Sequence, residues 1–164
     1  SKVRVNMGRA ELTPKLIPVL LPGESVVDRK VTIAGNEYSI TCVSIGNPHC
    51  VIFCNAVDEL NLAELGPVIE HCELFPDRVN VEFVEIMGRN NLKMRVWERG
   101  NGETLACGTG ACASAVASVL CEYSDKNSDI KVRLLGGELI IRYTDEAVFM
   151  TGDCKKVYDG VVEI

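Results

Sequence analysis

The residues best suited to chemistry lie close together, between Glu98 and Ala111. Within this segment Cys107 directly precedes the turn Gly108–Gly110, which opens a long apolar stretch. A thiol at the start of a helix lies near unpaired amides and the positive end of the helix dipole, which favour the thiolate. Glycines also leave the amides of such a turn open to an anion such as a carboxylate. We therefore predict a reactive thiol beside an anion site. The alternative is that the glycines only let a helix pack tightly on a sheet.

A carboxylate lies just before this segment, where the strand pattern would place an apolar side chain. Leu92, Met94 and Val96 alternate along a predicted strand, and Glu98 continues their face. A carboxylate on an apolar face must be paired or functional. Arg99 follows it, with a planar guanidinium suited to a carboxylate ligand. A direct ion pair between the two is the simpler alternative, but neighbours on a strand point to opposite faces.

Two turns bring further polar side chains to the ends of predicted strands. The turn Gly46–His49 carries Asn47 and His49, and the segment Phe75–Asn80 delivers Asn80 to the start of a strand. Each also has a structural interpretation. A lone histidine is more often a hydrogen-bonded structural residue, and an asparagine often caps a turn.

Strands are predicted wherever β-branched or alternating runs are bounded by turn residues. They span Lys2–Val5, Val31–Ile33, Tyr38–Ile45, Cys50–Cys54, Asn80–Ile86, Leu92–Arg99, Ile130–Leu134, Glu138–Tyr143, Ala147–Thr151 and Lys156–Val162. Two helices are predicted, at Asn61–Cys72 and Thr109–Tyr123. In the first, Asn61 with Glu64 indicates a cap, and Gly66–Pro67 indicates a break or kink.

The second helix determines the fold class. Between Ala111 and Cys121 its only polar residues are Ser114 and Ser118. A helix that is apolar all round must be surrounded by protein. Because strands outnumber helices, we predict an α+β fold with one domain over residues 1–164. In it, a largely antiparallel curved sheet or barrel wraps around a central buried helix.

Composition limits the partners and the location. The 164 residues carry a formal charge of −6 and no long basic run, which disfavours nucleic acid as a partner. Residues 105–121 carry no charge, but they are too few and too rich in small and polar residues to span a membrane. Eight cysteines without a secretion signal predict a cytoplasmic protein with reduced thiols.

The cysteines do not predict a metal site. Cys50 and Cys54 fall on one predicted strand, so their thiols would lie roughly 13 Å apart, too far for one zinc ion. Apart from Cys107, we expect the thiols to act as small apolar packing residues in the interior. This group includes Cys42, Cys54, Cys112, Cys121 and Cys154.

Taken together, these motifs resemble the diaminopimelate epimerase family over essentially the whole chain. The resemblance rests on Gly46–Cys50, Phe75–Val81, Glu98–Ala111, Gly136–Gly137 and Met150–Gly152. It implies a cofactor-independent isomerase of lysine biosynthesis, which inverts the α-carbon of diaminopimelate by proton transfer between two cysteines. It also implies two pseudo-symmetric domains, each built of strands around a central helix, with the active site between them.

The resemblance also implies roles for individual residues. Cys107 matches one of the two catalytic thiols. The amides of Gly108 and Thr109 match the groups that bind the reacting carboxylate. Glu98 and His49 match positions that contact the reacting centre and poise the thiols.

Three more positions match residues that bind the distal amino-acid end of the substrate: Asn47, Asn80 and Arg99. The family's second catalytic cysteine, which lies beside a Gly-Asn-Gly segment, has no match here. We therefore expect the chain to correspond to the C-terminal half, with a partner N-terminal domain supplying that cysteine. Residues 157–164 would be a strand that belongs with this domain, and the chain alone would be inactive or nearly so.

Other interpretations remain open at this point. Two copies could form a homodimer that supplies Cys107 twice. The chain could bind diaminopimelate without catalysis. It could also belong to a related isomerase family, such as proline racemase or the phenazine-pathway isomerases, although the first departs from the Glu98–Gly100 context and the second lacks the catalytic cysteine.

Overall fold

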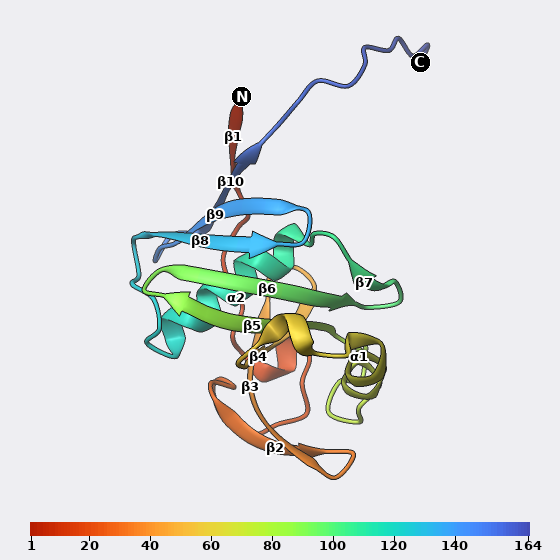
Figure 1. The fold of residues 1–164 in the computed structure, drawn as a ribbon, viewed down its shortest axis with the longest axis vertical. Helices are drawn as coiled ribbons and strands as arrows, with labels where there is room; N and C mark the ends of the chain where they lie inside the picture. Colours follow the sequence, from red (N-terminus) through yellow and green to blue (C-terminus); the bar gives the residue numbers. More distant parts are fainter.

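A computed structural model describes all residues 1–164 as one ten-stranded sheet with two α-helices (Figure 1). This confirms the predicted α+β class. The strands are β1 (Lys2–Asn6), β2 (Arg29–Ile33), β3 (Asn36–Ser44), β4 (Pro48–Phe53), β5 (Asn80–Gly88), β6 (Asn91–Glu98), β7 (Gly102–Thr104), β8 (Asp129–Leu134), β9 (Gly137–Tyr143) and β10 (Val148–Asp153). The helices are α1 (Leu62–Glu70) and α2 (Gly108–Leu120), with short 3-10 turns η1 (Pro14–Leu16) and η2 (Val57–Glu59).

The sheet is largely antiparallel, as predicted, but it does not close into a barrel. Its order is β1-β10-β9-β8-β6-β5-β4-β3-β2, with β7 paired to β6, so β1 and β2 remain as free edges. Two pairs, β4–β5 and β6–β8, are parallel. Parallel neighbours need a crossover connection. Here α1 lies in the first crossover and α2 in the second.

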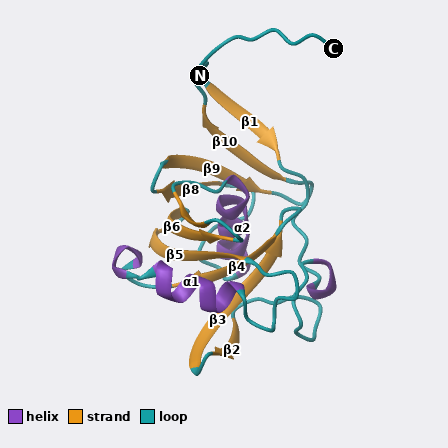
Figure 2. Ribbon diagram, turned by 90° about the vertical axis from the view of Figure 1, so that its right-hand side faces the viewer, coloured by secondary structure: helices purple, strands orange, loops and turns teal.

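The central position of α2 confirms the main prediction from the sequence. All residues from Gly110 to Ser118 are buried, and the strands curve around the helix (Figure 2). The helix supplies six members of a cluster of 17 buried apolar residues, and the others come from β3 to β6, from β8 to β10 and from Ile45 just after β3. The two serines are satisfied within the helix, because their hydroxyls donate to the carbonyls of Gly110 and Ala115 at 2.8 and 2.7 Å. No helix of the fold is long and apolar enough to cross a bilayer.

The other face of β3, β4 and β5 is covered by α1 and the segments around it, which form a second apolar cluster. Of the break or kink predicted at Gly66–Pro67, the break does not occur, because α1 runs through the proline. Leu62 and Ile69, one on either side of the proline, are 1% and 0% exposed, and their burial outweighs one lost backbone hydrogen bond. Asn61 is the N-cap residue of α1, as predicted, but its side chain accepts no capping hydrogen bond from the backbone; its amide donates to the Glu64 carboxylate at 3.4 Å instead.

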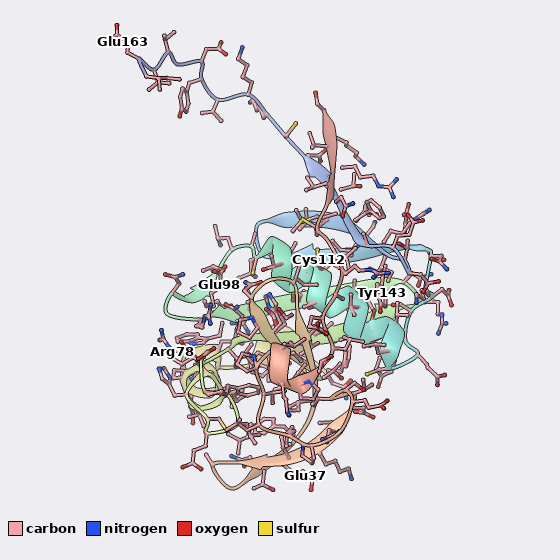
Figure 3. All side chains as sticks on the ribbon, turned by 180° about the vertical axis from the view of Figure 1, so that it is seen from behind. Glu37, Arg78, Glu98, Cys112, Tyr143 and Glu163 are labelled. Atoms are coloured by element: carbon pink, nitrogen blue, oxygen red, sulfur yellow. The ribbon has the colours of Figure 1, made fainter.

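The predicted strand at Lys156–Val162 does not form within this chain, and its pairing with an N-terminal domain stays a prediction. Residues after Asp153 have no secondary structure and are exposed, and they extend away from the body toward Glu163 (Figure 3). Backbone groups form a strand only where a neighbouring strand pairs with them, and none lies beside this segment. Strand β7 was not predicted, because three residues are too few to show alternation.

Gly66 gives a test of how tightly α1 lies on the sheet. A Cβ atom at this position would lie 2.3 Å from Cγ of Trp97. We expect Gly66→Ala to lower the free energy of unfolding by about 1–3 kcal/mol through overpacking. This would hold even though alanine favours a helix over glycine by about 1 kcal/mol. Urea denaturation measures the change.

The matched control is Gly88→Ala, where an added Cβ meets nothing within 4 Å. If both variants were equally stable, the close packing of α1 on Trp97 would be contradicted.

Candidate active site

The predicted site residues converge at the beginning of α2, where β4 and β5 begin and β6 ends. His49 in β4 pairs with Asn80 in β5, and Val81 pairs with Trp97 in β6. Because β5 and β6 are antiparallel, the residue before Val81, Asn80, lies opposite the residue after Trp97, Glu98. The neighbouring Val51, Val84 and Val96 belong to the cluster around α2, and alternation places His49 and Glu98 on that same face. The fold therefore brings together residues from distant parts of the sequence.

Cys107 is the N-cap residue of α2, as predicted. Its Sγ accepts a hydrogen bond from the Gly110 amide at 3.3 Å and lies 3.5 Å from the Thr109 hydroxyl oxygen. The amides of Gly108 and Thr109 are the first two of the helix and have no partner within the chain. A thiol and two free amide donors thus lie next to one another.

The expectation that the helix terminus makes Cys107 acidic is wrong for this chain. The pKa of Cys107 is raised, chiefly because the thiol is removed from water and also because the Glu82 carboxylate is nearby. The hydrogen bonds from Thr109 and Gly110 act in the opposite direction and lower the pKa, but less strongly. Burial therefore outweighs the helix terminus, and the thiol is the favoured form.

His49 is fully buried and joins Cys107 through a series of hydrogen bonds. Its Nδ1 lies 2.7 Å from Glu82 Oε1, and its Nε2 lies 3.0 Å from Asn47 Oδ1. The Asn47 amide donates in turn to the Thr109 hydroxyl oxygen at 3.1 Å. Because Asn47 Oδ1 can only accept, His49 Nε2 is the donor in their hydrogen bond. The Thr109 hydroxyl proton is left free to point at Cys107.

Glu82 was missed from the sequence. It is 0% exposed, shares the α2-facing side of β5 with Val84, and its Oε2 has no hydrogen-bond partner. A Cβ at Gly110 would lie only 2.7 Å from Glu82 Oε1, so this glycine allows the carboxylate to approach the helix. The signal was present: Glu82 lies in the largely apolar run Val81–Val84, and a carboxylate in such a run must be paired or functional.

The remaining predicted residues are held by other partners. Glu98 is half-buried, and its carboxylate accepts from the Thr104 hydroxyl at 2.6 Å rather than pairing with Arg99. Asn80 accepts from the Arg99 backbone amide at 2.8 Å and donates to a backbone carbonyl in β4 at 3.0 Å. The Arg99 guanidinium donates to the Asp77 carbonyl at 3.0 Å. The rejected Glu98–Arg99 ion pair does not form.

The other thiols divide by burial. Cys42, Cys50 and Cys112 lie in the core, and burial raises the pKa of Cys112 to about 12. The prediction that Cys154 is buried is wrong: it lies just after β10 and is exposed. Cys54 and Cys121 are only partly buried. No three His, Cys, Asp or Glu side chains are grouped so as to hold a metal ion.

The candidate site is an open face of the chain. None of the hollows on the surface is lined by Cys107, Asn47 or Glu98. In Figure 3, Glu98 lies on the body of the molecule beside the helix that carries Cys112, away from the extended tail.

Comparison with known proteins identifies the family. The family model for diaminopimelate epimerase matches residues 41–157, which include every predicted site residue. The chain belongs to the diaminopimelate epimerase family. It is 48% identical to the diaminopimelate epimerase of Synechocystis sp. and 51% identical to that of Acetivibrio thermocellus. These alignments cover 99% of this chain but only 59% and 58% of the two relatives.

Solved structures support the fold assignment. A probable proline racemase from Agrobacterium radiobacter matches with a TM-score of 0.67 at 15% identity, over 92% of this chain and 50% of that chain. A hydroxyproline epimerase from Agrobacterium vitis matches with a TM-score of 0.62 at 14% identity, over 92% of this chain and 49% of that one. At such low identity these matches establish the shared architecture only.

The hydrogen bond between Thr109 and Cys107 gives a test of the site's electrostatics. Thr109→Val removes the hydroxyl that lowers the pKa of Cys107, so we expect this pKa to rise further. Since only the thiolate is alkylated, the pH profile of Cys107 modification by iodoacetamide should move to higher pH. Peptide mapping by mass spectrometry measures it residue by residue.

Thr109→Ser keeps a hydroxyl and is the matched control, and the exposed Cys154 is the internal reference. An unchanged profile in Thr109→Val would show that the Thr109 hydroxyl does not donate to Cys107.

Proposed function

We propose that this chain forms one side of a diaminopimelate epimerase active site, in which Cys107 is one of two thiols that exchange the α-proton. The observation that carries the proposal is the place of Cys107 Sγ, at the cap of α2 beside the free amides of Gly108 and Thr109. Support comes from relatives up to 51% identical that are named diaminopimelate epimerase.

In this proposal the substrate's α-carboxylate binds the amides of Gly108 and Thr109. When the Cα–H bond breaks, its electron pair spreads into this carboxylate, and fixed N–H donors stabilise the growing charge. A thiolate on one face takes the proton and becomes a thiol. A thiol on the other face gives its proton to Cα and becomes a thiolate. The configuration is inverted, both transfers are made by thiols, and no cofactor is required.

Cys107 would begin this cycle as the proton donor. Burial and nearby carboxylates raise its pKa, so the thiol form is favoured before substrate binds. The hydrogen bonds from Thr109 and Gly110 would then stabilise the thiolate that remains after the proton is delivered. Glu98 and His49 would act beside it, each held by its own partner, Thr104 and Glu82.

The second thiol would come from outside this chain. The chain spans about three fifths of the length of its curated relatives, and its candidate site is open on one side. Cys112 cannot be the second thiol, because it lies five residues further along the same helix and is fully buried. We propose that an N-terminal epimerase domain carries this thiol, covers the open face, and pairs with the exposed segment 157–164.

The proposal is tested by incorporation of solvent deuterium at the α-carbon of diaminopimelate. The chain combined with the N-terminal domain should exchange and invert the substrate, whereas the chain alone should do neither. Cys107→Ser in the combined protein should slow the reaction by roughly 10²–10⁴-fold, because one of the two proton-transfer groups is lost.

Three results would contradict the proposal. Normal turnover by the chain alone would remove the need for a second domain, and a solution mass of two copies would then favour a homodimer that supplies Cys107 twice. Unchanged turnover in Cys107→Ser would exclude Cys107 as an acid or base. Tight binding without exchange in the combined protein would favour a non-catalytic binding role.

A further inference from the structure

A second buried carboxylate lies on the α1 side of the sheet and takes no part in the site described above. Glu70, the last residue of α1, is only 3% exposed. Its Oε2 accepts from the Trp97 indole N–H at 2.9 Å. Its Oε1 accepts from the Gly100 amide at 2.8 Å and from the Arg78 guanidinium at 3.3 Å. Each oxygen therefore has a donor, which compensates for the loss of water around the charge.

Two of these donors flank the residues that the site uses. Trp97 directly precedes Glu98, and Gly100 directly follows Arg99. We propose that Glu70 is a positioning residue. By accepting hydrogen bonds from Trp97 and Gly100, on either side of the Glu98–Arg99 dipeptide, it fixes the turn that presents Arg99 to the substrate. The proposal rests on the proposed function in one respect, that Arg99 contacts diaminopimelate.

The packing of α1 explains why Glu70 can reach this turn. Gly66 and Glu70 are four residues apart and share one face of the helix. The absence of a side chain at Gly66 lets the helix backbone lie directly on the Trp97 ring, where a Cβ would be 2.3 Å away. One turn later, the Glu70 carboxylate meets the edge of the same indole. Helix, ring and turn thus form one packed unit.

The contacts around the dipeptide indicate which residue depends on Glu70. The Glu98 side chain has its own anchor, the Thr104 hydroxyl at 2.6 Å. The Arg99 backbone is held by Asn80 at one side, and Glu70 holds the next amide along. Loss of the Glu70 contacts should therefore displace Arg99 more than Glu98. We expect an effect on substrate binding rather than on the proton-transfer step.

Glu70→Gln is a sharp test because a glutamine side chain cannot accept all the hydrogen bonds that Glu70 accepts. The carboxylate uses both oxygens as acceptors, whereas an amide offers one acceptor and one donor group. In the variant, either the Trp97 indole N–H or the Gly100 amide must face an NH₂ group. The matched control is Glu64→Gln, which makes the same charge change on an exposed face of α1.

The first readout uses this chain. Trp97 is its one tryptophan, so the indole N–H gives a single, unambiguous NMR signal. We expect Glu70→Gln to shift this signal and the Gly100 amide signal, and to leave the pH profile of Cys107 alkylation unchanged. Glu64→Gln should alter none of these. Unchanged Trp97 and Gly100 signals in Glu70→Gln would overturn the proposal.

The second readout is steady-state kinetics of the chain combined with the N-terminal domain. Glu70→Gln should raise KM for diaminopimelate about tenfold and leave kcat within about twofold, as expected when binding is lost uniformly. An unchanged KM, or a loss carried entirely by kcat, would overturn the positioning role. If the combined wild-type protein shows no epimerase activity, the proposed function fails, and the spectra still decide whether Glu70 holds the turn.

A second variant covers the case in which Glu70→Gln does not fold. Trp97→Phe removes the donor to Oε2 together with part of the indole ring, but it keeps an aromatic ring beside Gly66, the carboxylate and the Gly100 contact. It should raise KM in the same direction by a smaller factor, with kcat unchanged. No rise in KM in this folded variant would overturn the proposal.

Discussion

Burial of α2 is the constraint on which the rest of the structure depends. This helix has no polar face, so it is stable only where protein surrounds it. Strands β3 to β6 cover one side, and β8 to β10 complete the enclosure. Enclosing the helix also fixes its N-terminus at the ends of β4, β5 and β6. The position of Cys107 is thus set by the same packing that forms the core.

This packing leaves two carboxylates inside the protein, one on each side of the sheet. They differ in how many of their oxygens accept a hydrogen bond. Glu70 has a donor on each oxygen and acts as a fixed structural junction. Glu82 has one partner, His49, and one oxygen without any. An unsatisfied oxygen beside a helix N-terminus costs free energy. Sites of this kind concentrate where chemistry rather than stability determines the residue.

Much of the fold and most of the candidate site residues could be predicted from the sequence. At these positions the local sequence pattern and the packing of the whole fold favour the same structure. The run from Ala111 to Cys121, apolar except for Ser114 and Ser118, required an enclosing sheet, and Glu98 was recognised by its place on an apolar face. Pro67 was misjudged because a local rule was applied where burial of the surrounding helix outweighs it. The sequence left open whether the curved sheet would close into a barrel, because alternation predicts strands but not which edges meet.

The errors at the site have a common cause. Hydrogen-bond partners from distant strands, such as Glu82 for His49 and Thr104 for Glu98, depend on register, which the sequence does not show. The acidity of Cys107 was misjudged for a related reason. Position at a helix terminus can be recognised in the sequence, but the degree of burial around the thiol cannot.

The raised pKa of Cys107 also bears on how the proposed site would work. A carbanion survives best where water is excluded, yet exclusion of water disfavours the thiolate that the proposed transfer of the Cys107 proton would leave. Covering the open face would strengthen both effects. Hydrogen bonds that remain in place when water leaves are then the means of stabilising the thiolate. The Gly110 amide and the Thr109 hydroxyl, the latter oriented through Asn47 by the buried His49–Glu82 pair, are placed to do so. Their value increases as the surroundings become drier, because charge-assisted hydrogen bonds are stronger in a low dielectric.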